Sequence, residues 1–180
     1  MRATCGEPSR TRRILGIDPG TLSAGYGVIE VSAGNMRALT FGVIRAGSRR
    51  SLAERLKTVF DSLVEVIHQV KPDEVAIEEV FVGKSMRSAI RSGEGRGVAI
   101  LAAATQGLPV WGYPPTVIKR SVTGVGSAHK SQVMEMVKTI LGLKATLTSE
   151  DASDALACAI CHAHRRGPGG QVPSHEKAGW

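Results

Sequence analysis

The chain has 180 residues, of which 42% are hydrophobic and 22% are charged, and its formal net charge is +7. This composition is typical of a soluble globular protein, and no segment is apolar for long enough to span a bilayer. The length fits a single domain. The positive charge favours a polyanionic partner, nucleic acid before an anionic membrane surface, although a merely basic protein fits the charge nearly as well.

Both ends of the chain differ in composition from the region between them. Residues 1–12 lack the apolar stretch of a secretory signal and are predicted to form a mobile basic arm, while residues 167–180, rich in Gly and Pro, are predicted to form a flexible tail. Residues 13–166 are predicted to form the domain. Of three cysteines, two lie close together in one helical pattern, so we expect a reduced, cytoplasmic protein without disulfides.

The apolar patterns predict an α/β domain with a mixed sheet. Three strands come first, over residues 13–20, 25–31 and 39–47, and a turn signal at Gly34-Asn35 predicts that they form an antiparallel meander. An amphipathic helix follows, begun by a capping box of Ser51 and Glu54. The remaining patterns predict strands over 71–81 and 108–115, the latter running into a proline-stiffened bend, and helices over 88–107, 131–143 and 149–166.

Four acidic residues come from three separate elements of this order. Asp18 ends the first strand, Glu78 lies at the end of a later strand, and Asp151 and Asp154 share one face of the last helix. Carboxylates converge only where something offsets their repulsion, and hard cations such as Mg²⁺ or Mn²⁺ do so. Two such ions about 4 Å apart can clamp the attacking and leaving oxygens of a phosphodiester. Because neighbouring strand residues face opposite sides, Glu78 is favoured over Glu79 as the ligand.

The last helix also contains a second metal-like pattern. Cys158, Cys161 and His162 spell C-x-x-C-H, which attaches c-type haem, and together with His164 they could hold zinc. The surrounding run is apolar, however, and buried cysteine behaves as a small hydrophobe. We therefore predict that both cysteines pack in the core.

Two segments resemble phosphate loops. Residues 124–131, GVGSAHKS, nearly fit a nucleotide P-loop, but His129 stands where the second glycine is required. What remains is a Gly-rich turn that opens a helix with Lys130 near its start, which suits a backbone phosphate. The segment GIDPGT is similar to a loop of actin-like ATPases, although no second phosphate loop or adenosine motif accompanies it.

Five segments in order resemble the RuvC family of bacterial Holliday-junction resolvases over about residues 13 to 165: ILGIDPGTLSAGYGVIE, VAIEEVFVGK, RGVAILAA, VIKRSVTGVGSAHKSQV and DASDALACAICHAH. The resemblance implies a ribonuclease-H-like fold with a mixed five-stranded sheet flanked by helices. It implies a homodimer that nicks two strands of a four-way junction during recombination and DNA repair. By position, it implies that Asp18, Glu78, Asp151 and Asp154 bind two Mg²⁺ ions, with Mn²⁺ as a substitute.

The resemblance also implies contacts with DNA. Lys119 matches a basic residue that faces the scissile phosphate and takes part in catalysis, and Lys130 matches one that faces the backbone. Phe81 matches an aromatic residue that stacks on a base near the junction. We predict further DNA contacts at Lys84, Arg87 and Arg120. The branch-migration proteins RuvA and RuvB are implied partners, no organic cofactor is expected, and no membrane is involved.

Two other functions stay open on the residues alone: a non-catalytic junction or duplex-binding protein, and a small actin-like ATPase. A two-fold dimer would place two acidic clusters on opposite strands of a junction. The Gly- and Ala-rich helix over 88–104 is the predicted dimer contact, although its small residues suit packing on the chain's own sheet nearly as well. The small residues are Gly93, Gly95, Gly97, Ala99, Ala102, Ala103 and Ala104.

Overall fold

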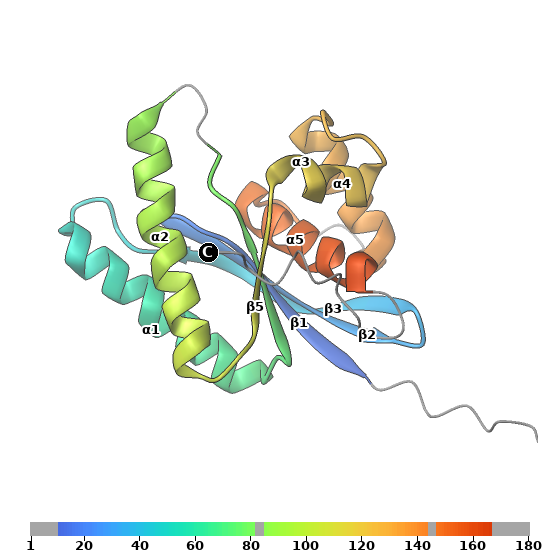
Figure 1. The fold of residues 1–180 in the computed structure, drawn as a ribbon, viewed down its shortest axis with the longest axis horizontal. Coiled ribbons are helices and arrows are strands. Elements are labelled where there is room, and N and C mark those ends of the chain that lie inside the picture. The colour runs from blue at the N-terminus through green and yellow to red at the C-terminus, as the bar shows by residue number, and fades with distance from the viewer. Residues whose placement is uncertain (1–10, 82–84, 144–146, 167–180) are drawn as a thin grey trace, which may run out of the picture.

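The computed structural model describes residues 11–81, 85–143 and 147–166, which form one five-stranded sheet with helices on both faces (Figure 1). The sheet has the order β3-β2-β1-β4-β5, in which β1 pairs antiparallel with β2 and parallel with β4. The mixed sheet is therefore confirmed. Its strands are β1 (Arg12–Asp18), β2 (Ser23–Ser32), β3 (Asn35–Arg45), β4 (Glu74–Glu78) and β5 (Val110–Tyr113).

Two groups of helices cover the sheet, one on each face (Figure 1). On one face lie α1 (Leu52–Val70) and α2 (Met86–Thr105), and on the other lie α3 (Pro115–Thr123), α4 (Lys130–Leu141) and α5 (Glu150–Arg166). Side chains of β1 alternate between the two cores, because successive strand residues point to opposite faces. Ile14 packs in the core beneath α5, and Leu15 and Ile17 pack beneath α1 and α2.

Several local signals produce the expected structure. Ala33 and Gly34 form the two-residue turn between β2 and β3, and both have positive φ. The common type I′ hairpin turn requires positive φ at both of its central residues. Ser51 and Glu54 form the predicted capping box of α1. The hydroxyl of Ser149 accepts a hydrogen bond from the backbone N–H of Ala152 and so caps α5.

The helix α3 was not among the predicted elements. The pair Pro114-Pro115 suggests a bend, yet Pro115 occupies the first turn of α3, where its missing N–H has no helical partner to lose. Ile118 and Val122 lie one turn apart and are buried, and Gly124 ends the helix with a φ of 82°. The proline at the start and the glycine just past the end were the sequence signal for this helix.

The helix α5 lies directly on the sheet and is buried over most of its length. Close approach is possible because β1 and β2 contribute glycines there: a Cβ atom on Gly16 would clash with the Ala155 carbonyl oxygen, and one on Gly25 with that of Asp151. The helix also contacts β3, β4, α3 and α4. It is therefore the centre of the core on this face.

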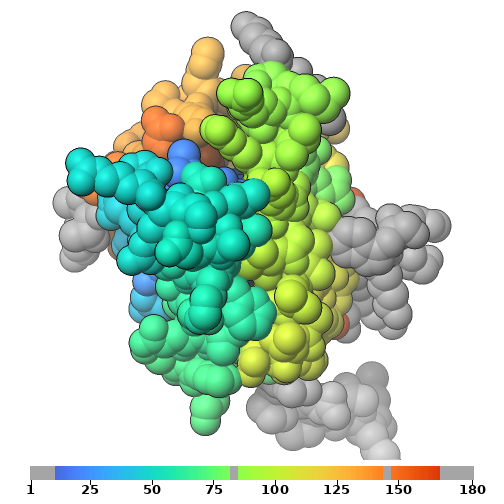
Figure 2. All heavy atoms as spheres, turned by 90° about the vertical axis from the view of Figure 1, so that its left-hand side faces the viewer, coloured from blue at the N-terminus to red at the C-terminus, as the bar shows by residue number. Residues whose placement is uncertain are grey.

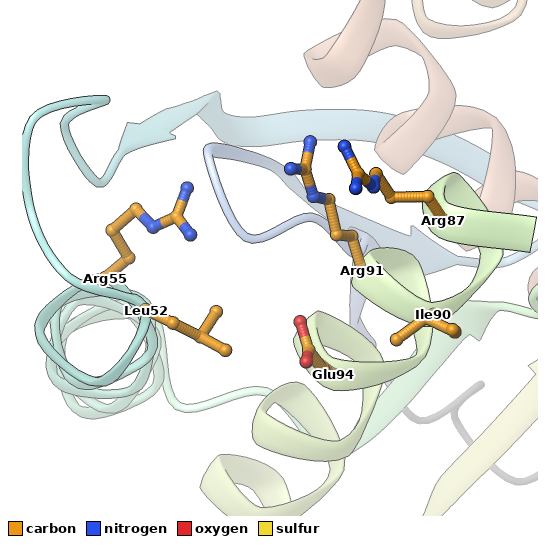
Figure 3. A pocket seen from close by; sticks show the side chains of 6 residues that line it. All are labelled: Leu52, Arg55, Arg87, Ile90, Arg91 and Glu94. Atoms are coloured by element: carbon orange, nitrogen blue, oxygen red, sulfur yellow. The ribbon is translucent and has the colours of Figure 1, made fainter.

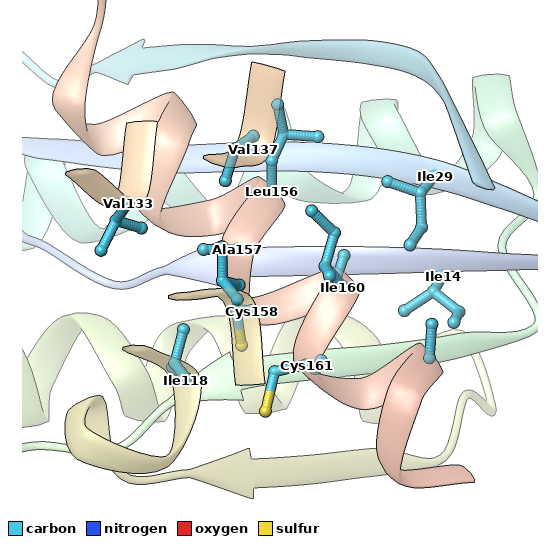
Figure 4. Close-up of a cluster of buried hydrophobic side chains, with 14 of the residues drawn as sticks. Ile14, Ile29, Ile118, Val133, Val137, Leu156, Ala157, Cys158, Ile160 and Cys161 are labelled. Carbon is cyan, nitrogen blue, oxygen red and sulfur yellow. The ribbon is translucent and has the colours of Figure 1, made fainter. Parts of the chain in front are cut away.

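The two cysteines of α5 are packing residues, as predicted (Figure 4). Both are fully buried, and burial raises the pKa of Cys158 well above that of a free thiol. His162 is also fully buried: its Nδ1 lies 2.6 Å from the Tyr113 hydroxyl and its Nε2 lies 2.7 Å from a carboxylate oxygen of Glu74. These contacts occupy both ring nitrogens of His162.

The small residues of α2 are divided between two environments. Gly95, Ala99, Ala102 and Ala103 are buried within their own chain, so they are not the exposed dimer contact that their composition suggests. The face that stays exposed contains Gly97, Leu101 and Ala104, at i, i+4 and i+7. Packing of α2 on α1 and the sheet accounts for the buried set.

The predicted terminal arm and tail lie almost wholly outside the described residues. Arg12 already belongs to β1, so regular structure begins one residue earlier than expected. No helix in the described segments has the length and apolar character needed to cross a membrane.

Candidate active site

The carboxylates of Asp18 and Glu78 meet at the edge of the sheet. Ile17 of β1 is paired with Ile77 of β4 in parallel register, so the next residue of each strand ends it at the same level. Parallel neighbours lie about 4.8 Å apart. The two acidic side chains are close enough to share a hydrogen bond.

The helix α5 brings two more acids to this edge. Asp18 is paired in β2 with Gly25, and the face of Gly25 is covered by the backbone of Asp151. Asp154 follows three residues later, nearly one turn along the same helix face. The pairing of β1 with β4 therefore brings Asp18 beside Glu78, and the contact of Gly25 with α5 brings Asp151 and Asp154 to the same edge.

Their environment opposes ionisation. Burial, followed by the charges of Glu78, Asp154 and Asp151, raises the pKa of Asp18 to about 8. Burial, followed by the charge of Asp154, raises the pKa of Glu78 to about 7. The pKa of Asp154 is also raised, chiefly by burial, although the nearby Lys130 ammonium opposes the shift. Without a further cation, the cluster holds at least one proton near neutral pH.

Two lysines reach the cluster from α3 and α4. The Lys130 Nζ atom lies 3.4 Å from Asp154 Oδ2 and 3.1 Å from Glu150 Oε2. Partial burial tends to lower the pKa of Lys130, but these carboxylates outweigh it and raise the pKa. Lys119 is near enough for its charge to lower the pKa of Glu78. The cluster is thus partly neutralised by ammonium groups of the chain itself.

A hard divalent cation fits this donor set. All four donors are carboxylates, the ligand type that Mg²⁺ and Mn²⁺ prefer. Burial and the neighbouring acids raise the pKa of Asp18 and Glu78, and a bound cation would offset both effects. Across the described segments, no three Asp, Glu, His or Cys side chains are already arranged as the ligands of one ion. The Lys130 ammonium lies 3.4 Å from Asp154 Oδ2, so an ion bound by Asp154 would compete with this ion pair.

Glu79 points away from the cluster, as strand alternation predicts. A Cβ atom placed on Gly112 of β5 would lie 2.7 Å from Glu79 Oε1 and 3.1 Å from a guanidinium nitrogen of Arg96 on α2, so both side chains lie beside Gly112. The helix α2 covers the opposite face of the sheet from α5. Glu79 is therefore separated from Asp151 and Asp154 by the sheet.

The predicted DNA-contacting residues lie around this edge at different places. Phe81 follows β4 and is 72% exposed, which leaves its ring free to meet a base. Arg87 is exposed in the first turn of α2, and Arg120 is exposed on α3 with its guanidinium against Gly126. Lys84 lies outside the described residues.

One residue of the site was missed. Glu150, four residues before Asp154, lies on the same face of α5 and pairs with Lys130. The i, i+4 spacing of these two acids was the available signal, because such residues are neighbours on a helix surface. Glu150 is exposed, so it supplies a second carboxylate for the Lys130 ammonium rather than a buried ligand.

Comparison with known proteins agrees with this geometry. The family described as crossover junction endodeoxyribonuclease RuvC matches residues 14–162. A relative of that name from Saccharophagus degradans is 52% identical over 83% of this chain and 86% of its own length, and one from Pelotomaculum thermopropionicum is 46% identical over 84% and 92%. Neither the non-catalytic binder nor the actin-like ATPase is supported by these matches.

A solved structure titled "T. thermophilus RuvC in complex with Holliday junction substrate" matches with a TM-score of 0.78 and 35% identity, over 84% of this chain and 92% of that one. A second Thermus thermophilus RuvC structure gives a TM-score of 0.80 at 34% identity, over 89% and 99%. These matches confirm the ribonuclease-H-like fold. Together with the family match over most of the domain, they show that the chain belongs to the RuvC family of crossover junction endodeoxyribonucleases.

Proposed function

We propose that the chain resolves Holliday junctions by hydrolysing one phosphodiester bond in each of two strands, with two divalent cations in each active site. Nucleases of the RuvC family are metal-dependent. We propose Mg²⁺ as the ion and Mn²⁺ as a working substitute. The observation that carries the proposal is the convergence of Asp18, Glu78, Asp151 and Asp154 at one partly buried sheet edge, in a chain of net charge +7.

The four acids that would hold the ions belong to three rigid elements, two strands and one helix. Asp18 and Glu78 belong to neighbouring central strands, and Asp151 and Asp154 belong to the buried helix α5. When bound, the cations supply Lewis acidity that activates the attacking water and stabilises the leaving oxygen. Because strands and helix are fixed in the core, the carboxylates keep their relative positions when DNA arrives.

Basic residues beside the acids hold the DNA strand. We assign Lys119, whose charge acts on Glu78, to the negative charge that develops at the scissile phosphate. Lys130 begins α4, and its ammonium, which pairs with Asp154 and Glu150, would be the group that contacts a backbone phosphate. Phe81 stacks on a base, and the remaining backbone contacts come from Lys84, Arg87 and Arg120.

The proposed reaction needs a second copy of the chain. One cluster makes one cut at a time, whereas a two-fold dimer places two clusters on opposite strands of a junction. We propose the exposed face of α2, with Gly97, Leu101 and Ala104, as the contact between copies. RuvA and RuvB are the proposed branch-migration partners. Because its substrate is DNA, we place the protein's action in the cytoplasm.

Cleavage of a synthetic four-way junction in Mg²⁺ tests the site. Asp18→Asn, Glu78→Gln, Asp151→Asn and Asp154→Asn should each lower the cleavage rate by at least about 10²-fold, since each removes a charged carboxylate that would hold a cation at the reacting phosphate. Binding of the junction in EDTA should stay within about threefold of the parent, because the basic surface is intact.

Glu79→Gln is the matched control for this experiment. It removes an adjacent carboxylate from the opposite side of the same strand end, so it should cleave at the parent rate. Full activity in the Glu78→Gln variant, or a loss in Glu79→Gln as large as in the others, would contradict the assignment of the ligands.

A further inference from the structure

Glu150 lies at the rim of the carboxylate cluster. It is the first residue of α5, and its side chain is 62% exposed, so its carboxylate stays in contact with water. Its Oε2 atom lies 3.1 Å from the Lys130 Nζ atom, which is nearer than Asp154 Oδ2 at 3.4 Å. One ammonium group therefore bridges an exposed and a half-buried carboxylate that are four residues apart on the same helix.

The ion pair of Glu150 with Lys130 adds little to the stability of the fold. Both side chains are more than half exposed, and water screens the charges of such a pair. Glu150 also places a negative charge beside the cluster: burial is the main cause of the raised pKa of Asp154, and the charge of Glu150 adds to it. The same charge repels the phosphates of DNA. The contact with the Lys130 ammonium is therefore what Glu150 contributes to the site.

The ammonium of Lys130 is the main positive charge that the chain supplies to the cluster. Burial is the largest influence on the pKa of Asp18, Glu78 and Asp154 and raises all three values. In each case the charge of Lys130 is the largest positive charge that opposes the increase. Lys119 adds a smaller effect on Glu78. The position of one ammonium group thus affects three of the proposed ligands.

The arginines between α1 and α2 do not share this role. Arg55, Arg87 and Arg91 line a cleft between these two helices (Figure 3). Figure 2 shows α1 and α2 side by side, and they cover the face of the sheet opposite to α4 and α5. The main charges that act on the acids of the cluster do not include these three arginines. A residue that positions the Lys130 ammonium therefore controls most of the cluster's internal neutralisation.

The Lys130 ammonium and a divalent cation compete for Asp154. Both are attracted by the same carboxylate, and the ammonium already lies within ion-pair distance of it. A cation that binds Asp154 must therefore displace the ammonium. Glu150 offers the displaced ammonium a carboxylate outside the cluster, which lowers the free energy needed to release Asp154. A ligand binds more tightly when the state that it requires costs less to reach.

We propose that Glu150 is a positioning residue that draws the Lys130 ammonium from Asp154 to the rim of the cluster and thereby strengthens the binding of a divalent cation. The inference rests on the proposed function, because it assumes that Asp154 binds such a cation. At the rim, the ammonium is exposed at the start of α4, where a phosphate of the DNA can reach it. Glu150 itself acts through Lys130 and contacts neither the ion nor the reacting phosphate.

Glu150→Gln tests the inference, because glutamine keeps the length of the side chain and removes its charge. Binding of Mn²⁺ to the DNA-free protein is measured from the EPR signal of the free ion, and junction cleavage is measured over a range of Mg²⁺ concentrations. The Kd for Mn²⁺ and the Mg²⁺ concentration that gives half-maximal cleavage should each rise at least about fivefold. The cleavage rate at saturating Mg²⁺ should stay within about twofold of the parent rate.

A double-mutant cycle with Lys130→Ala separates this role from a direct effect of the Glu150 charge. Lys130→Ala alone should tighten the binding of Mn²⁺, because it removes the competing ammonium. In the Lys130→Ala protein, Glu150→Gln should change the Kd for Mn²⁺ by less than about twofold. If Glu150 acted on the ion directly, as a ligand or through its charge, the effect of Glu150→Gln would persist without Lys130.

Glu135→Gln is the matched control, since Glu135 is an exposed acid that pairs with Lys138 within α4. It should leave the Kd for Mn²⁺ and the Mg²⁺ dependence of cleavage unchanged. Three results would overturn the inference: an unchanged Kd in Glu150→Gln, an effect of Glu150→Gln that is equally large with and without Lys130, or a loss confined to the rate at saturating Mg²⁺. Failure of the unmodified protein to cut junctions in any divalent cation would instead refute the proposed function, so the two failures are distinguishable.

Discussion

Asp18 combines a proposed role in catalysis with a cost to folding. Its carboxyl is buried among other acids, so its pKa rises to about 8, while in the unfolded chain it is near 4. The folded protein therefore binds the proton more tightly than the unfolded chain between these values. Stability falls as pH rises through this window, because the unfolded state gains more from ionisation.

Asp18→Asn should accordingly stabilise the metal-free protein while it abolishes cleavage. At pH 8, urea unfolding in EDTA should show a gain of at least about 1.4 kcal/mol, the equivalent of one pKa unit, and the gain should shrink by pH 5. Asp61→Asn, an exposed acid paired with Lys57, serves as the control and should show no such pH-dependent gain. A destabilised Asp18→Asn protein would mean that the residue acts in folding.

Individual residues of the site were predictable to different degrees. Asp18 and Glu78 could be found because a strand that ends in an acid is visible in the sequence. The choice between Glu78 and Glu79 followed from alternation, and the structure places Glu79 near Arg96 on the far side. The close contact of Gly95 with the backbone of Gly20 could not be predicted, because it depends on how α2 packs on the turn after β1, and sequence periodicity does not give that packing.

At the scale of elements, the C-terminal half of α5 is fixed by a buried polar network. His162 bridges Tyr113 of β5 and Glu74 of β4, and Glu74 also pairs with Arg166 and Arg12. Burial lowers the pKa of His162, which stays neutral in the fold. Burial opposes ionisation of Glu74, but hydrogen bonds from His162 and Arg166 prevail and lower its pKa.

This network predicts a loss of stability in acid. In the unfolded chain His162 gains a proton near pH 6.5, whereas in the folded protein burial opposes its protonation. Stability should therefore decline as pH falls below about 6.5. It should decline further below about pH 4.5, where Glu74 of the unfolded chain gains a proton. His162→Gln should cost about 1–3 kcal/mol at pH 8 and remove part of the decline between pH 7 and 5. Urea unfolding at several pH values measures both, with the exposed His164→Gln as control. An unchanged decline in His162→Gln would contradict this origin.

Helices and strands with a strong hydrophobic periodicity were predicted correctly, whereas the short helix α3 and the buried face of α2, which depend on tertiary contacts, were not. The amphipathic helix α1 and the hairpin of β2 and β3 follow from local pattern and turn chemistry. The helix α3 is only 9 residues long, and its proline pair also fits a bend. The burial of Ala99 and Ala103 depends on tertiary packing, which composition alone does not reveal.

At the scale of the whole molecule, the proposed paired cut depends on two-fold symmetry. Sedimentation at micromolar concentration should show a dimer, free and bound to a junction. Leu101→Asp should shift the free protein toward a monomer, because it places a charge in the proposed contact, where Leu101 is 55% exposed. Met136→Asp on α4, 37% exposed, is the matched control and should leave the dimer intact. A stable dimer in the Leu101→Asp variant would move the contact elsewhere.

The burial of α5 has a consequence for the protein's synthesis. Asp18 and Glu78 leave the ribosome early, but Asp151 and Asp154 belong to the last helix of the domain, and the core of one face forms around that helix. Chains grow from the N-terminus at about 5–20 residues per second. For several seconds a nascent chain therefore contains only two of the four acids of the candidate site, and one face of its sheet is uncovered. The step that closes that face would also complete the proposed active site, so we expect that an unfinished chain does not cut DNA.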